Sequence, residues 1–200
     1  MIKLEIHFYG VEIVYLFSTI THETRSIVQS FSKISKTKRM IIGSIFSCLA
    51  AVFQMAGGLL PVVGYFISPL ATAPILICSI FSKSFGLSSY LLTILLLLVL
   101  EPSELIIFPF TTGLLGLGIG FAFHYFEKRL SIILSGAISL TSGITILLFG
   151  MQFPVLGPSV SHDFDLLMIG SIFLCSIFYS WLWVGFAFKN IKKFHKSLWT

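Results

Sequence analysis

Long stretches without Asp, Glu, Lys or Arg divide this sequence. These uncharged, mostly apolar runs cover residues 40–82, 84–100, 105–126, 130–162 and 166–188. A transmembrane helix needs roughly 20 apolar residues, with about 17 as the lower limit. The first run is therefore long enough for two helices, and each of the others for one. The sequence predicts an all-α, polytopic membrane protein that folds as a compact six-helix transmembrane bundle.

The positions of the charged residues indicate how these helices cross the bilayer. When the chain is threaded through the membrane six times, all 13 Lys and Arg residues fall on one side. The opposite connections contain no Lys or Arg, and they hold Glu101, Glu104, Asp163 and Asp165. Basic loops resist translocation and stay in the cytoplasm. We therefore expect a multi-pass protein of the cell membrane with both termini in the cytoplasm.

The overall composition agrees with a membrane protein and argues against several other classes. Only 10% of residues are charged, against about 25% in soluble domains. The net charge of +5 comes from Lys and Arg beside the bilayer, so no nucleic-acid partner is expected. The sequence has no zinc-protease motif, no phosphate-binding loop and no Ser/His/Asp constellation. We expect no enzyme, no metal site and no cofactor, and without a charged side chain within a span no ion-coupled carrier of the usual design.

The chain divides into three parts. Residues 1–39 form an N-terminal cytoplasmic segment, for which an amphipathic helix with a basic linker, poor order and an upstream start codon that extends the working protein are all open. Residues 189–200 form a basic cytoplasmic tail. Residues 40–188 form the transmembrane domain, whose first span is expected to end at Gly57 and Gly58 because glycines followed by proline stop helices. The predicted spans are 40–56, 62–81, 84–100, 105–123, 131–151 and 166–188.

Small residues recur along the first predicted span. Gly43, Ser47 and Ala51 are four residues apart and therefore share one face of the helix. Such small-residue ladders let transmembrane helices approach closely. This face either packs against the protein's own helices or docks a second membrane protein, and the sequence does not separate these alternatives.

Polar side chains near the predicted outer ends of the spans form a candidate ligand site. A group of such side chains at one depth suits a small polar or heteroaromatic ligand. The amide of Gln54 lies within an apolar run and requires a partner, which is either a ligand or another helix. The acidic residues Glu101, Glu104 and Asp163 are expected to face water instead. The candidate ligand-binding residues are Gln54, Tyr65, Thr111, Thr112, Gln152 and His162.

These features together resemble a known family. Six short spans, cytoplasmic ends, a small-residue face on the first span and a Gly-Gly-x-x-Pro break after it are similar to an S component. S components are the substrate-binding membrane subunits of energy-coupling factor (ECF) transporters. The most similar stretch runs from Phe46 to Gly120 and includes Leu-Pro-Val-Val-Gly at 60–64 and Phe-Thr-Thr-Gly at 110–113, while the hydropathy pattern matches over 40–188.

The resemblance implies a function and partners. In that family an Ala-x-x-x-Ala pattern on the first helix meets the transmembrane T subunit, and Ser47-x-x-x-Ala51 is the matching stretch here. The resemblance implies capture of a vitamin-like micronutrient near the outer face, with import driven by separate ATPase subunits. Our leading hypothesis is thus a substrate-capturing uptake subunit with residues 57–65 as a lid. The absence of buried charge favours a neutral ligand over an anionic one.

Two alternatives stay open at this point. The first is a structural or assembly membrane protein that carries no small-molecule cargo and uses its small-residue faces for partner helices. The second, less favoured, is a helical-bundle enzyme that acts on lipid.

Overall fold

A computed structural model describes residues 31, 34–60, 62–153 and 166–197. Most of these residues are helical, and they include no β-strand. They contain 6 helical segments that are long and apolar enough to cross a membrane, namely 36–59, 64–81, 83–100, 104–125, 129–150 and 167–190. The prediction of an all-α fold with six helices able to span a membrane is confirmed.

Three of these spans are single helices and three are composite. The single helices are α3 (Lys36–Leu59), α6 (Lys83–Leu100) and α10 (Leu166–Ser197). The second span joins α4 (Gly64–Ile67), the 3-10 helix η1 (Ser68–Ala71) and α5 (Thr72–Phe81). The fourth joins α7 (Glu104–Phe110) to α8 (Thr112–Tyr125). The fifth is α9 (Arg129–Thr145), which ends in the π-helical turn η2 (Ile146–Gly150).

The first span does not end where the sequence predicted. Helix α3 continues through Gly57 and Gly58 and ends at Leu59, before Leu60 takes an extended conformation. The prediction of a glycine stop was wrong because these glycines allow close packing and do not end the helix. A Cβ atom added to Gly57 would lie only 2.8 Å from the Glu104 carboxyl group.

The fourth span was predicted as one helix, and the structure divides it at Thr111. This residue has φ −118° and ψ −98°, which lies outside the helical region. Pro109 stands inside α7 and has no N–H to bond to the preceding turn. The helix then restarts with a 2.9 Å bond from the Leu115 N–H to the Thr111 carbonyl oxygen.

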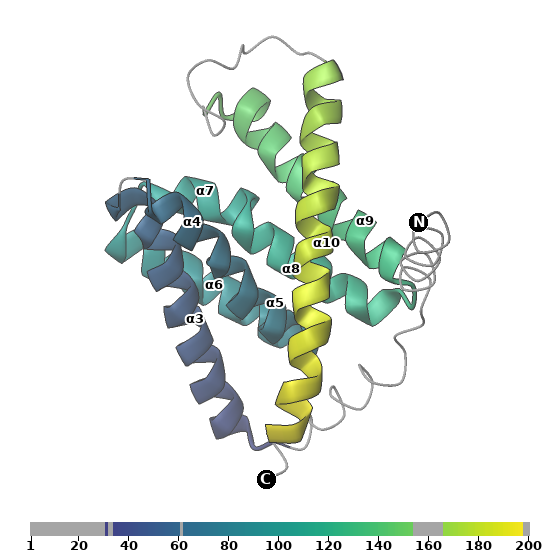
Figure 1. The fold of residues 1–200 in the computed structure, drawn as a ribbon. Coiled ribbons are helices and arrows are strands. Elements are labelled where there is room, and N and C mark those ends of the chain that lie inside the picture. Colours follow the sequence, from purple (N-terminus) through teal and green to yellow (C-terminus); the bar gives the residue numbers. More distant parts are fainter. Residues whose placement is uncertain (1–30, 32–33, 61, 154–165, 198–200) are drawn as a thin grey trace.

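The spans pack in a sequence of neighbours and do not form a closed ring. Helix α3 contacts α4, α5 and α6, whereas α10 contacts mainly α9. The two halves meet where α5 packs against α8. Within the described residues α3 and α10 have no extensive contact, and in the view of Figure 1 the helix α5 lies between them.

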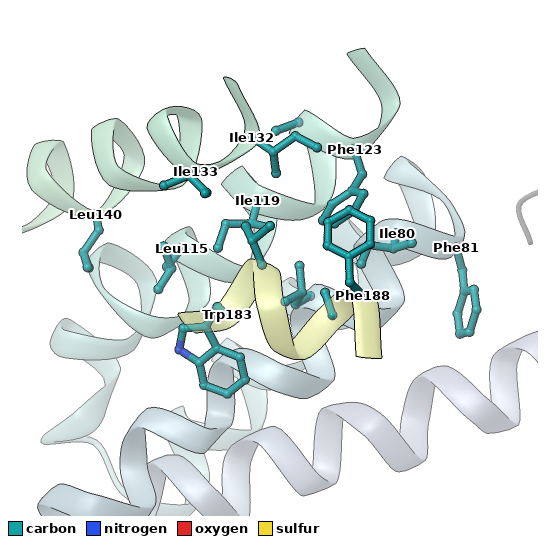
Figure 2. Packing of buried hydrophobic residues seen from close by; sticks show 14 of the residues in the cluster. Ile80, Phe81, Leu115, Ile119, Phe123, Ile132, Ile133, Leu140, Trp183 and Phe188 are labelled. Atoms are coloured by element: carbon teal, nitrogen blue, oxygen red, sulfur yellow. The ribbon is translucent and has the colours of Figure 1, made fainter. Parts of the chain in front are cut away.

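Two clusters of buried apolar side chains stabilise this arrangement. The larger cluster joins α5, α8, α9 and α10, and Figure 2 shows its side chains converging, with the rings of Phe123 and Phe188 beside each other. Their ring centroids are 5.2 Å apart. The smaller cluster joins α3, α5 and α6 to the α7–α8 span. Phe31, which precedes the first span, belongs to the larger cluster and stacks on Phe81 with a centroid distance of 4.7 Å.

The described basic side chains gather at one end of the bundle. Lys83, which opens α6, lies 3.8 Å from the ring centroid of Tyr125 at the end of α8. The Arg129 guanidinium group lies 4.0 Å from the ring centroid of Phe188 on α10. These contacts place the α5–α6 and α8–α9 connections beside the carboxyl-terminal part of α10. We call this the basic end, and the opposite end, which carries Glu101 and Glu104, the acidic end.

Candidate functional site

A buried polar network joins three helices at the acidic end. The side chain of Gln54 on α3 is fully buried, and that of Glu104 at the start of α7 is 6% exposed. The Gln54 Nε2 donates to Glu104 Oε2 at 2.7 Å. The Thr112 Oγ1 at the start of α8 donates to Gln54 Oε1 at 2.7 Å. The partner that Gln54 required is therefore supplied by other helices of the same protein.

The burial of Glu104 corrects the expectation that this residue faces water. Its position after the turn at Pro102 and Ser103 suggested a loop, but it is the first residue of α7 and packs against α3. The missing side chain of Gly57 leaves room for the carboxyl group there. Gln54 was the signal that could have identified Glu104, because a buried amide at that depth needs a polar partner.

The Glu104 carboxyl group has unused capacity to accept hydrogen bonds. An ionised carboxylate offers about four acceptor positions, yet the described residues supply a donor only to Oε2. The other oxygen, Oε1, lies near Gly57 on the side where the Ser68 hydroxyl group also approaches that glycine. The described Lys and Arg side chains belong to the opposite, basic end. The buried carboxyl group thus has one neutral hydrogen-bond donor and no described basic neighbour.

The two threonines of the candidate set differ in their surroundings. Thr112 belongs to the network, as described. Thr111 lies at the break between α7 and α8, where its Oγ1 donates to the Ile107 carbonyl oxygen at 2.7 Å. This bond stays within the α7 segment, so Thr111 contributes to the end of that helix and does not contact Gln54.

The remaining candidate residues do not join the network. Tyr65 on α4 is 75% exposed and lies on the surface of the bundle. Gln152, which follows η2, is exposed and has a positive φ of 51°. His162 lies outside the described residues. Of the candidate ligand residues, the structure therefore brings together Gln54 and Thr112, with Glu104 between α3 and α7.

The small-residue face of α3 is turned toward α6. Ser47 is fully buried, and its Oγ lies 2.8 Å from the Oγ of Ser89. A Cβ atom on Gly43 would lie 2.7 Å from the ring of Phe85. Ala51 is also fully buried. Of the two alternatives for this face, packing against the protein's own helices is the one that the structure displays.

The network lies beside two interruptions of the transmembrane helices. The 3-10 helix η1 interrupts the second span, and the break at Thr111 interrupts the fourth. Irregular backbone at membrane depth is tolerated where it is buried in protein or lines a cavity. Within the described residues no group of three His, Cys, Asp or Glu side chains could hold a metal ion. Comparison of the chain with protein-family models, with curated proteins and with solved structures gives no match.

Proposed function

We propose that this chain is the substrate-capturing integral membrane subunit of a small-solute uptake transporter. The observation that carries the proposal is Glu104, a carboxyl group buried in a span with one oxygen free to accept a hydrogen bond. Ionisable groups inside membrane spans are expensive, and those that are retained usually mark a ligand or ion pathway. The interrupted second and fourth spans give further support, since broken helices form the binding sites of many transporters.

In this proposal the solute reaches the site from the acidic end of the bundle. Glu104 contacts the solute, while Gln54 and Thr112 hold the carboxyl group in place. Tyr65, Gln152 and His162 stay predicted contacts at the entrance. As in the S components that the sequence resembles, a vitamin-like micronutrient would be the cargo, and a T subunit with separate ATPase subunits would supply the energy.

Purification with bound cargo tests this function. The protein is extracted from its membrane in mild detergent and analysed by native mass spectrometry. We expect a stoichiometric small molecule on the wild type that is lost in Glu104→Gln, because this change keeps the side-chain volume and removes the charge. Glu127→Gln makes the same chemical change at the basic end and should retain the molecule. Repeated wild-type preparations without any bound molecule, and without thermal stabilisation by a vitamin panel, would refute the proposal.

The second candidate function is a structural or assembly role without cargo. It is favoured by the hydrogen bonds that Gln54 receives and donates within the protein, since these need no ligand to be complete. Gly170 on α10 adds to this, because it is exposed and has no neighbouring atom within 4 Å of an added Cβ atom. Such an open small residue allows a partner helix to approach α10 closely. In this case Glu104→Gln would change neither the co-purifying small molecules nor the thermal stability of the protein relative to the wild type.

A further inference from the structure

We propose that the solute carries a protonated amine, which is held by the Glu104 carboxylate. The inference rests on the proposed uptake function and names the class of its substrate. It differs from the neutral ligand that the sequence favoured, because that expectation assumed no charged side chain among the spans. The structure buries one such side chain, that of Glu104, and the charges around its carboxyl group determine which ligand fits.

The charges at the acidic end favour a cationic ligand. A buried carboxylate needs a positive partner or a proton. The described basic residues lie at the other end of the bundle, and the hydrogen-bond partner of Glu104, Gln54, is neutral. A cationic ligand would supply such a partner and keep the carboxyl group ionised. An anionic ligand would be repelled by the carboxyl groups of both Glu104 and Glu101.

The side chains of Glu101 and Glu104 both lie beside the end of α3. Consecutive glycines near the end of α3 each face one of them. A Cβ atom on Gly57 would lie 2.8 Å from Glu104 Oε1, and one on Gly58 would lie 3.3 Å from the Glu101 carboxyl carbon. Both carboxyl groups therefore lie against the same short stretch of backbone. Two carboxyl groups this close together concentrate cations at this point when both are ionised.

The hydrogen-bonding atoms near Gly57 match the donors of an ammonium group. Glu104 Oε1 and the half-buried Ser68 Oγ both lie within 3.3 Å of the position of a Cβ atom on that glycine. Neither oxygen has a hydrogen-bond partner among the described residues. An ammonium group has three donors and no acceptor, so it can satisfy the carboxylate and the hydroxyl group at the same time. A bare metal cation fits less well, because calcium takes six to eight oxygen ligands and magnesium needs an octahedral set.

The charge class is tested with three compounds of similar size on detergent-purified, ligand-depleted protein. Propylammonium, propionamide and propionate are cationic, neutral and anionic, and each is added at constant ionic strength while the melting temperature is recorded. We expect only propylammonium to stabilise the wild type. Glu104→Gln should weaken its binding by roughly thirtyfold or more, as for loss of one partner of a buried charge pair. Ser68→Ala should weaken it less, and Glu127→Gln should bind like the wild type.

The results separate this inference from the function on which it rests. Equal stabilisation by propionamide or propionate, or an unchanged response of Glu104→Gln, would overturn the amine assignment. A molecule that co-purifies with the wild type and has no basic nitrogen would overturn it as well, while leaving the uptake function in place. If no molecule co-purifies and none of the three compounds stabilises the protein, both proposals fail. Sodium chloride that stabilises as well as propylammonium would assign the site to an inorganic cation instead.

Discussion

At the residue scale, the hydrogen bond between Gln54 and Glu104 could be predicted from the sequence only in part. The need of Gln54 for a partner was predictable, because an amide in an apolar run cannot be left unsatisfied. The identity of the partner was not, since Glu104 is 50 residues away and follows a turn that looked exposed. Only the packing of α7 on α3 brings the two side chains together.

Substitution of two glutamines, one within the network and one at the surface, should affect stability differently. Gln54→Ala should lower the free energy of unfolding by about 1–3 kcal/mol, because it leaves the Glu104 carboxyl group buried without its donor. Gln152→Ala alters an exposed side chain and should change stability by less than about 0.5 kcal/mol. Thermal and denaturant unfolding in detergent measure the change in the free energy of unfolding for each variant. Equal effects of the two substitutions would mean that the bond between Gln54 and Glu104 does not contribute to stability.

At the scale of helices and turns, the sequence predicted the spans well and their interruptions poorly. The uncharged runs gave the approximate bounds of each span, because helix length in a bilayer is fixed by its thickness. Gly57 and Gly58 were misread as a stop, since a glycine that ends a helix and one that admits a neighbouring side chain look alike in sequence. The break at Thr111 follows Pro109, which lacks the N–H that a continuous helix needs, but a proline in a membrane helix does not by itself show where the helix breaks.

Two glycines on neighbouring helices should respond differently to the same substitution. A Cβ atom on Gly143 of α9 would collide with the carbonyl group of Phe110, whereas Gly170 of α10 has open space around it. We expect Gly143→Ala to lower stability by about 1–3 kcal/mol through overpacking. Gly170→Ala should be neutral or slightly stabilising. The melting temperatures of the two variants are measured in the same detergent. Equal melting temperatures would contradict the close packing of α9 on α7.

At the scale of the whole molecule, the charges sort by end as the sequence indicated. Contacts such as the one between Arg129 and Phe188 place the described basic connections together at one end. The orientation in the cell follows from the positive-inside rule and stays a prediction. The larger apolar cluster links the second span to the last three, so the bundle is held together mainly through α5 and α8.

Chemical labelling of single cysteines tests the orientation. In a variant without Cys48, Cys78 and Cys175, Ser103→Cys lies in the exposed turn at the acidic end. A membrane-impermeant maleimide should label it in intact cells. Ser84→Cys, which is exposed near the basic end, should react only after permeabilisation. The reverse pattern would invert the orientation and place the proposed site on the cytoplasmic side.

The stacking of Phe31 on Phe81 makes Phe31 part of the packed bundle, although this residue precedes the first span. The Phe31 ring is 2% exposed and also lies beneath the Arg39 guanidinium group, at 5.3 Å. Translation from the internal codon for Met40 would therefore produce all six spans yet leave a ring-sized void next to Phe81. Removing a buried phenylalanine side chain typically costs about 3–5 kcal/mol. A shortened version of this chain should keep Phe31 if it is to be as stable as the full one.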